Sequence, residues 1–173
     1  NRPVVLRSFM QDAGTHAIAV GFPEGIHYSF DSEKIRLASA WKGRFIDARG
    51  TWFERFTPPA EPLGESLLRF SQGQSFALLD GENARWPEWE DQANLYQFRG
   101  YRLDAKGIPT FLYQFAQWQI EERIEPMGKR GLRRQWNIKR LKSDPAAVGD
   151  ESAVLNLSIH QAAKLQRHAV NQV

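Results

Sequence analysis

The sequence predicts an all-β fold: an antiparallel β-sandwich of about eleven short strands, with a fragment of a larger supersandwich-like assembly as the alternative. Apolar and polar residues alternate with a period of two through most of the first 140 residues, and helical spacing is hard to find there. Turn-forming residues separate these segments every ten to fifteen positions. A chain of 173 residues with 42% hydrophobic content is also large enough to bury one real core.

Two segments show the alternation best. The IHYSF segment places its apolar side chains on one face and His27 and Ser29 on the other, which is typical of a half-buried strand. The IRLASAW segment repeats the pattern, with Ile35, Leu37 and Trp41 predicted on one side. The remaining predicted strands are residues 4–9, 17–22, 51–56, 76–79, 95–103, 110–115, 119–125, 132–138 and 154–160.

Turn chemistry separates the strands and suggests the domain limits. The FPEG and DAKG segments place Pro or Gly where a tight reversal needs them, so both predict hairpins. Residues 58–64 hold three prolines and predict an extended loop, as do the acidic residues 80–91. We predict a sandwich domain over residues 1–142, a polar linker or long hairpin loop over 143–152, and one or more terminal strands over 153–173 that complete or extend the sandwich.

Composition excludes several kinds of chemistry. The chain has no cysteine, which excludes disulfides, thiolate metal sites, a cysteine nucleophile and covalent attachment of c-type haem to this chain. No apolar run approaches the roughly 20 residues of a membrane helix, so no membrane insertion is expected. Because the sequence begins with Asn and lacks a leader-like start, we expect that any targeting segment was removed or lies outside this chain.

The segment of residues 40–56 combines two tryptophans, three phenylalanines, four basic residues and two carboxylates. Aromatic rings stack on the apolar faces of sugars, and charged side chains hydrogen-bond to hydroxyl groups. We therefore predict a carbohydrate-like ligand on a site made of Trp41, Arg44, Asp47, Trp52 and Arg55. The alternative is that these aromatic residues fill the core and the charged ones form surface ion pairs.

Two histidines lie near opposite ends of the hairpin predicted around the FPEG turn, and they could approach each other across it. The catalytic candidates are His16 or His27 as a general base and Asp47 or Glu54 as an acid. A histidine packed beside a turn and bonded to the backbone is the alternative for either position. No third ligand follows at metal-binding spacing, so no metal site is predicted.

Charge is concentrated in one stretch. Residues 129–142 contain seven Lys and Arg residues and no acidic one, although the whole chain carries a formal charge of only +3. Leu132, Trp136 and Ile138 share one face of the predicted strand there, and Arg133 and Lys139 share the other. This is typical of a strand with one solvated face. It suggests docking of an acidic partner, while nucleic-acid binding is not our prediction.

Several stretches also resemble a known module. The strings NRPVVLRSFM, GTHAIAVGFPEGIHYSFD, AWKGRFIDARGTWFERFTPP and FRGYRLDAKGIPTFLYQF resemble a module of large exported multidomain proteins of planctomycete-type bacteria, where it accompanies c-type cytochrome domains. The resemblance covers roughly residues 1–138. It implies a periplasmic or exported location and a haem c in another domain of the parent protein. It brings no assigned activity, and we expect no cofactor within this chain.

The hairpin YRLDAKGIPTFLYQF is also loosely similar to the sandwiches of galactose mutarotase-like proteins, although no catalytic residue of that family maps onto this chain. We therefore expect a non-catalytic binding module for a carbohydrate-like ligand, within a larger exported redox protein that contains a c-type cytochrome. The alternatives are a sugar-active enzyme using a His and carboxylate pair, and a structural domain that docks a haem domain or subunit through residues 129–142.

Overall fold

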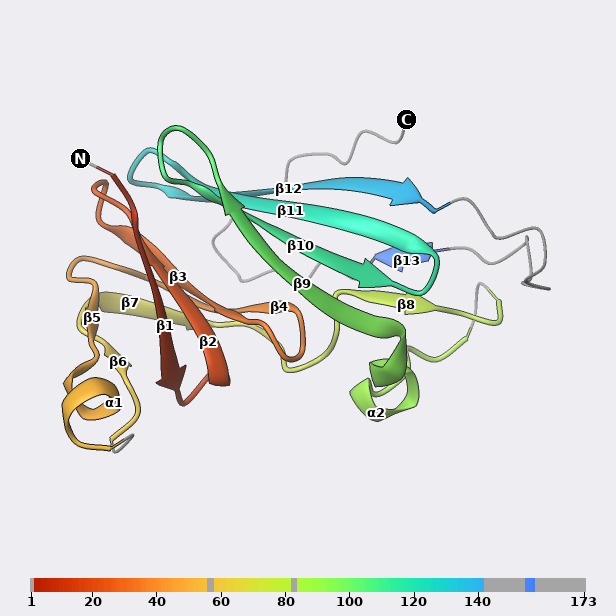
Figure 1. Ribbon diagram of the computed structural model, residues 1–173, viewed down its shortest axis with the longest axis horizontal. Coiled ribbons are helices and arrows are strands. Elements are labelled where there is room, and N and C mark those ends of the chain that lie inside the picture. The colour runs from red at the N-terminus through yellow and green to blue at the C-terminus, as the bar shows by residue number, and fades with distance from the viewer. Residues whose placement is uncertain (1, 56–57, 82–83, 142–154, 158–173) are drawn as a thin grey trace.

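The computed structural model describes residues 2–55, 58–81, 84–141 and 155–157, and most of these residues lie in antiparallel strands (Figure 1). The all-β sandwich prediction is confirmed. One layer is a five-stranded sheet with the order β1-β2-β3-β4-β7. Its strands are β1 (Val4–Met10), β2 (Gly14–Gly21), β3 (Ile26–Asp31), β4 (Arg36–Lys42) and β7 (Glu65–Arg69).

The second layer is a four-stranded sheet with the order β12-β11-β10-β9. Its strands are β9 (Tyr96–Leu103), β10 (Pro109–Phe115), β11 (Trp118–Met127) and β12 (Gly131–Arg140). Two small pairs complete the described strands: β5 (Ile46–Asp47) with β6 (Glu61–Pro62), and β8 (Phe76–Leu78) with β13 (Leu155–Leu157). The helices are α1 (Arg49–Phe53), α2 (Trp89–Gln92) and the 3₁₀ turn η1 (Ala93–Leu95). None of the described helices is long and apolar enough to cross a membrane.

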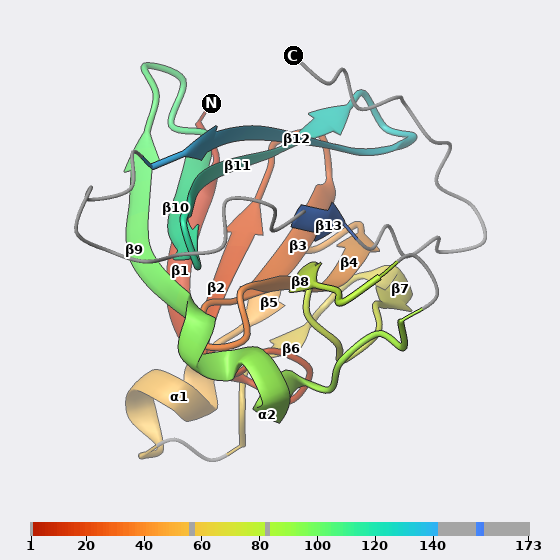
Figure 2. The same cartoon turned by 90° about the vertical axis from the view of Figure 1, so that its right-hand side faces the viewer.

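The main core lies between the two sheets, which face each other as two layers in both views (Figure 2). Aromatic side chains fill it. The rings of Phe30 and Phe111 stack in parallel with their centroids 4.0 Å apart, and Tyr28 and Tyr101 meet Phe111 edge to face. Large aromatic residues bury the most apolar area per side chain, so these contacts dominate the association of the layers.

A second, smaller core covers the outer face of the five-stranded sheet. Small side chains on that face, including Ala17, Ala19 and Ala38, leave room for Trp41. The segment that runs through β5, α1 and β6 packs there, with Phe45 and Ile46 against the cluster. As a result every residue of β3 is buried, although its sequence alternates between apolar and polar.

Three local predictions are wrong. Residues 51–56 were predicted as a strand, but residues 49–53 form α1. Ile35, Leu37 and Trp41 were predicted on one face, but a register shift in β4 places Leu37 in the inter-sheet core and Trp41 in the outer one. Ile35 precedes β4 with a positive φ of 49°. The predicted loop over 80–91 contains the start of α2. Residues 154 and 158–160 of the last predicted strand, and the predicted linker over 143–152, lie outside the described residues.

Candidate functional site

The helix α1 is fixed to the body of the domain although it is only five residues long. Asp47 Oδ1 accepts the backbone N–H of Arg49 at 2.9 Å where the helix begins. The buried Ser8 hydroxyl on β1 donates to Thr51 Oγ1 at 3.1 Å. At Gly50 the backbone approaches so closely that a Cβ would lie 2.2 Å from the Pro58 carbonyl oxygen. These contacts hold the helix in one place on the outer face.

This anchored helix nevertheless turns two aromatic rings to solvent. Trp52 is 60% exposed and Phe53 is 83% exposed. Arg49 precedes them by three and four positions, so its side chain lies next to both on the helix surface. Its Nε also pairs with Glu54 Oε1 at 3.2 Å. We call Arg49, Trp52, Phe53 and Glu54 the aromatic surface of α1, which lies at the lower left of Figure 1.

Trp41 does not belong to this surface, which corrects the prediction that it faces a ligand. It is 1% exposed, its ring stacks on that of Phe45 with centroids 6.1 Å apart, and its Nε1–H is shared between the carbonyls of Arg44 and Phe45. No ring face is left for a sugar. The side chains of Arg44 and Arg55 are exposed, and Arg55 follows α1 with a positive φ of 55°.

His27 is a buried structural residue. Its Nδ1 accepts the backbone N–H of Phe22 at 3.1 Å, so Nε2 carries the ring proton and donates to the carbonyl of Gly43 at 2.7 Å. Both nitrogens are occupied by backbone groups that need a partner. This geometry agrees with the structural alternative for His27 and leaves neither nitrogen available as a general base.

His16 lies at the other end of the β2 and β3 pair, so the two histidines do not approach each other. Gly21 is the partner of His27 in this pair, whereas Ala17, next to His16, is the partner of Asp31. Because side chains alternate between the two faces of a strand, those of His16 and His27 also lie on opposite faces of the sheet. The described residues hold no group of three or more His, Asp and Glu that could bind a metal.

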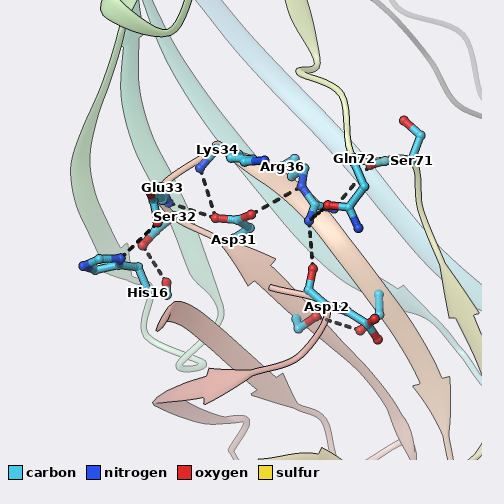
Figure 3. Close-up of polar contacts among 11 residues, drawn as sticks. Asp12, His16, Asp31, Ser32, Glu33, Lys34, Arg36, Ser71 and Gln72 are labelled. Atoms are coloured by element: carbon cyan, nitrogen blue, oxygen red, sulfur yellow. Dashed lines mark hydrogen bonds and ion pairs between the residues drawn. The ribbon is translucent and has the colours of Figure 1, made fainter. Parts of the chain in front are cut away.

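The neighbour of His16 is Glu33, a residue that the sequence analysis did not select. His16 Nδ1 lies 3.3 Å from Glu33 Oε2, and the Ser32 hydroxyl donates to the His16 carbonyl at 2.7 Å (Figure 3). The predicted acids are elsewhere: Asp47 begins α1 and Glu54 pairs with Arg49. Only the fold, through the β2 and β3 register, brings positions 16 and 33 together.

A buried ion pair between Asp31 and Arg36 stabilises the β3 to β4 turn, which carries Glu33. Arg36 Nε lies 3.3 Å from Asp31 Oδ2, and both side chains are less than a tenth exposed (Figure 3). Asp31 Oδ1 also accepts the backbone N–H groups of Glu33 and Lys34, each at 3.0 Å. The pair therefore fixes the turn that carries Glu33.

The guanidinium of Arg36 also joins segments that are distant in sequence. It donates to the carbonyls of Asp12 and Ser71 and to Gln72 Oε1, at distances of 2.8 to 3.3 Å. Burial lowers the pKa of Arg36, and the Asp31 and Asp12 carboxylates oppose that shift. Because the guanidinium of Arg36 has hydrogen-bond or ion-pair partners in several segments, its buried positive charge is compensated.

The basic residues of the 129–142 stretch are less available for binding a partner than their number suggests. Arg133 pairs with Glu125, and Arg134 turns inward, where its Nε donates to the fully buried Glu122 at 2.7 Å. Tyr113 donates to the same carboxylate at 3.0 Å. Burial, together with the charge of Glu122, raises the pKa of Tyr113 well above its ordinary value. Residue 142 lies outside the described part of the chain.

The comparisons with known proteins give no relative on which to base the site. No family model, no curated protein and no solved structure matches the chain.

Proposed function

We propose that this chain is a non-catalytic binding module that holds a carbohydrate-like ligand on the aromatic surface of α1. The observation that carries the proposal is the exposure of Trp52 and Phe53 on a helix that the fold anchors at Asp47, Gly50 and Thr51. Exposing large aromatic side chains gains nothing for folding, whereas such a surface suits a ligand.

The polar groups of this surface suit a sugar. The indole of Trp52 offers an apolar face for stacking, while Arg49 and Glu54 provide a donor and an acceptor beside it. Of the predicted ligand-binding residues Trp52 lies on this surface, where Arg49, Phe53 and Glu54 join it, and Trp41 leaves the set because it is buried. The resemblance of the sequence to modules of exported, cytochrome-containing proteins supports a periplasmic location and a haem c in a neighbouring domain as parts of this proposal.

The two alternatives receive less support from the geometry. An enzyme using His16 or His27 with Asp47 or Glu54 needs a base beside one of these acids, but both nitrogens of His27 are bonded to the backbone. His16 lies beside Glu33 instead. Docking of a haem domain through residues 129–142 needs free positive charge, but Arg133 and Arg134 are paired with glutamates.

The test is the retention of the protein on a panel of immobilised oligosaccharides. We expect Trp52→Ala to weaken binding about fivefold, the effect of losing one stacking partner worth roughly 1 kcal/mol. Leu103→Ala is the matched control, because Leu103 is also exposed (54%) but lies on β9 in the other sheet. A folded Trp52→Ala variant that binds as well as the parent, or the absence of any retained glycan, contradicts the proposal.

A further inference from the structure

A groove lies between the two sheets, away from α1, where the β3 to β4 turn faces the middle of β9. It measures about 450 Å³ and is lined by Arg7, His16, Ser32, Glu33, Phe98, Arg99 and Gly100. This size suits a ligand of one or two small rings. The lining residues come from β1, β2, the β3 to β4 turn and β9, so the groove exists only in the folded chain.

Two guanidinium groups of this groove lack a carboxylate partner. Further along β9 and on β11 and β12, Arg102, Arg123 and Arg133 each form an ion pair. In contrast, within the described part of the chain, Arg7 forms no ion pair and packs over the ring of Tyr101, and Arg99 donates only to the neutral Gln114, at 3.1 Å. The groove therefore carries two cations against one carboxylate, that of Glu33.

The backbone of β9 is irregular at Arg99, which lines the groove. The register with β10 shifts between Leu112, the partner of Gly100, and Tyr113, the partner of Phe98. Arg99 is the extra residue of this bulge, and Gly100 has a positive φ of 111°. A bulge changes the direction of a side chain relative to a regular strand.

The third polar side chain of the groove is His16, which lies beside Glu33 on the β3 to β4 turn. Glu33 approaches Nδ1 of His16, and the Asp31–Arg36 pair fixes the turn that carries Glu33. Within the described residues Nε2 of His16 has no hydrogen-bond partner, so it is available as a ligand contact.

We propose that this groove binds the oxyanion group of a small ligand, a carboxylate or a phosphate, between Arg7 and Arg99, with His16 as a further contact. Guanidinium groups recognise both oxyanions through paired N–H donors. Phe98 supplies an apolar wall beside them. The site is separate from the aromatic surface of α1 and does not depend on it.

The experiment titrates the 173-residue chain with inorganic phosphate, glucuronate and glucose while amide chemical shifts are followed by NMR. We expect saturable shifts at Arg7, Arg99 and Gly100 with phosphate or glucuronate and none with glucose. Binding of phosphate alone identifies a phosphate ligand, and stronger binding of glucuronate identifies an acidic sugar.

Variants then assign the binding to the named groups. Arg7→Gln and Arg99→Gln should each weaken anion binding about tenfold, the usual effect of removing one charged donor. Glu33→Gln should strengthen it about threefold, because it removes the one negative charge of the groove. Arg102→Gln on the same strand is the matched control and should bind normally, as should Trp52→Ala, which separates this site from the proposed function.

Three results would overturn the inference. The first is an absence of saturable shifts in the groove with either anion. The second is an equal loss of binding in Arg99→Gln and Arg102→Gln, which would indicate a general charge effect rather than a site. The third is equal binding of glucose and glucuronate, since the oxyanion would then contribute nothing.

Discussion

The outer faces of the two sheets show how similar sequence patterns lead to opposite environments. In β3 the outward side chains are His27, Ser29 and Asp31, and all are buried, His27 against Phe45 and Asp31 against Arg36. In β11 the outward side chains include Glu121 and Glu125, which pair with arginines from β9 and β12 and remain in contact with water. Both strands alternate with a period of two.

The difference lies in the size and charge of the outward side chains. The covered face holds small residues and polar groups that bond within the protein, such as Ser29 and Ser39, whose hydroxyl oxygens are 2.7 Å apart. The open face holds long charged side chains, for example Arg102, which makes two bonds to Glu121 at 2.8 and 2.9 Å. Alternation therefore predicts the strand, and the kind of polar residue indicates whether another layer covers it.

The largest expected effect breaks the buried pair on the covered face. Arg36→Ala leaves the Asp31 carboxylate buried without its cation and should lower the free energy of unfolding by roughly 3–5 kcal/mol. Arg102→Ala on the open face should lower it far less, because exposed ion pairs contribute little. Urea denaturation of both variants measures the contrast, and equal losses would show that the two faces do not differ in this way.

A smaller effect is expected from the two histidines. His27→Leu removes the acceptor of the Phe22 N–H and the donor to the Gly43 carbonyl, and should cost about 2 kcal/mol of stability. His16→Leu should change stability by less than about 0.5 kcal/mol, since its side chain is 67% exposed. Thermal unfolding of the His27→Leu and His16→Leu variants measures this difference. A His16→Leu variant as unstable as His27→Leu would contradict the conclusion that only His27 has a structural role.

The smallest effect is a dependence on acid pH carried by the open face. Hydrogen bonds from Arg102 hold the pKa of Glu121 below its ordinary value. Burial raises the pKa of Glu125, but hydrogen bonds from Arg133 and Arg123 outweigh it, and its pKa is also lowered. Carboxylates with lowered pKa values stabilise the fold above the unfolded-state pKa, and this contribution is lost as the pH falls through the folded-state pKa.

We therefore expect stability to decrease below about pH 4.5, where unfolded glutamates begin to bind protons. Arg102→Gln should make this pH dependence shallower, because it removes the hydrogen bonds that lower the pKa of Glu121. Denaturation at a series of pH values between 3 and 7 measures it. A variant whose acid sensitivity exceeds that of the parent would contradict the role given to Arg102.

The sequence predicted the fold class and most strands because alternation and turn residues are local signals. It did not predict α1, since the five helical residues are too few to establish a helical period and the same segment alternates like a strand. The sides of β4 were also assigned wrongly, because a bulge reverses the alternation without any signal in composition.

The candidate site was predicted only in part, for a related reason. Exposure separates Trp52 from Trp41, and exposure depends on which segment covers which face. The groove residues Arg7, Glu33 and Arg99 are distant in sequence and meet through strand register. Similarly, Arg134 and Glu122 occupy inward positions where alternation predicts apolar residues, so their buried ion pair had no local signal.

The close contact at Gly50 also has a consequence for how this surface can vary. Positions 50 and 51 face the body of the domain and have little freedom, since any side chain at 50 collides with Pro58 and Thr51 is buried. Positions 52 and 53 face outward and contribute almost nothing to packing. The turn thus separates residues that maintain the scaffold from residues that contact the ligand in the proposed function, so that function predicts that new side chains at 52 and 53 change ligand preference while the scaffold stays the same.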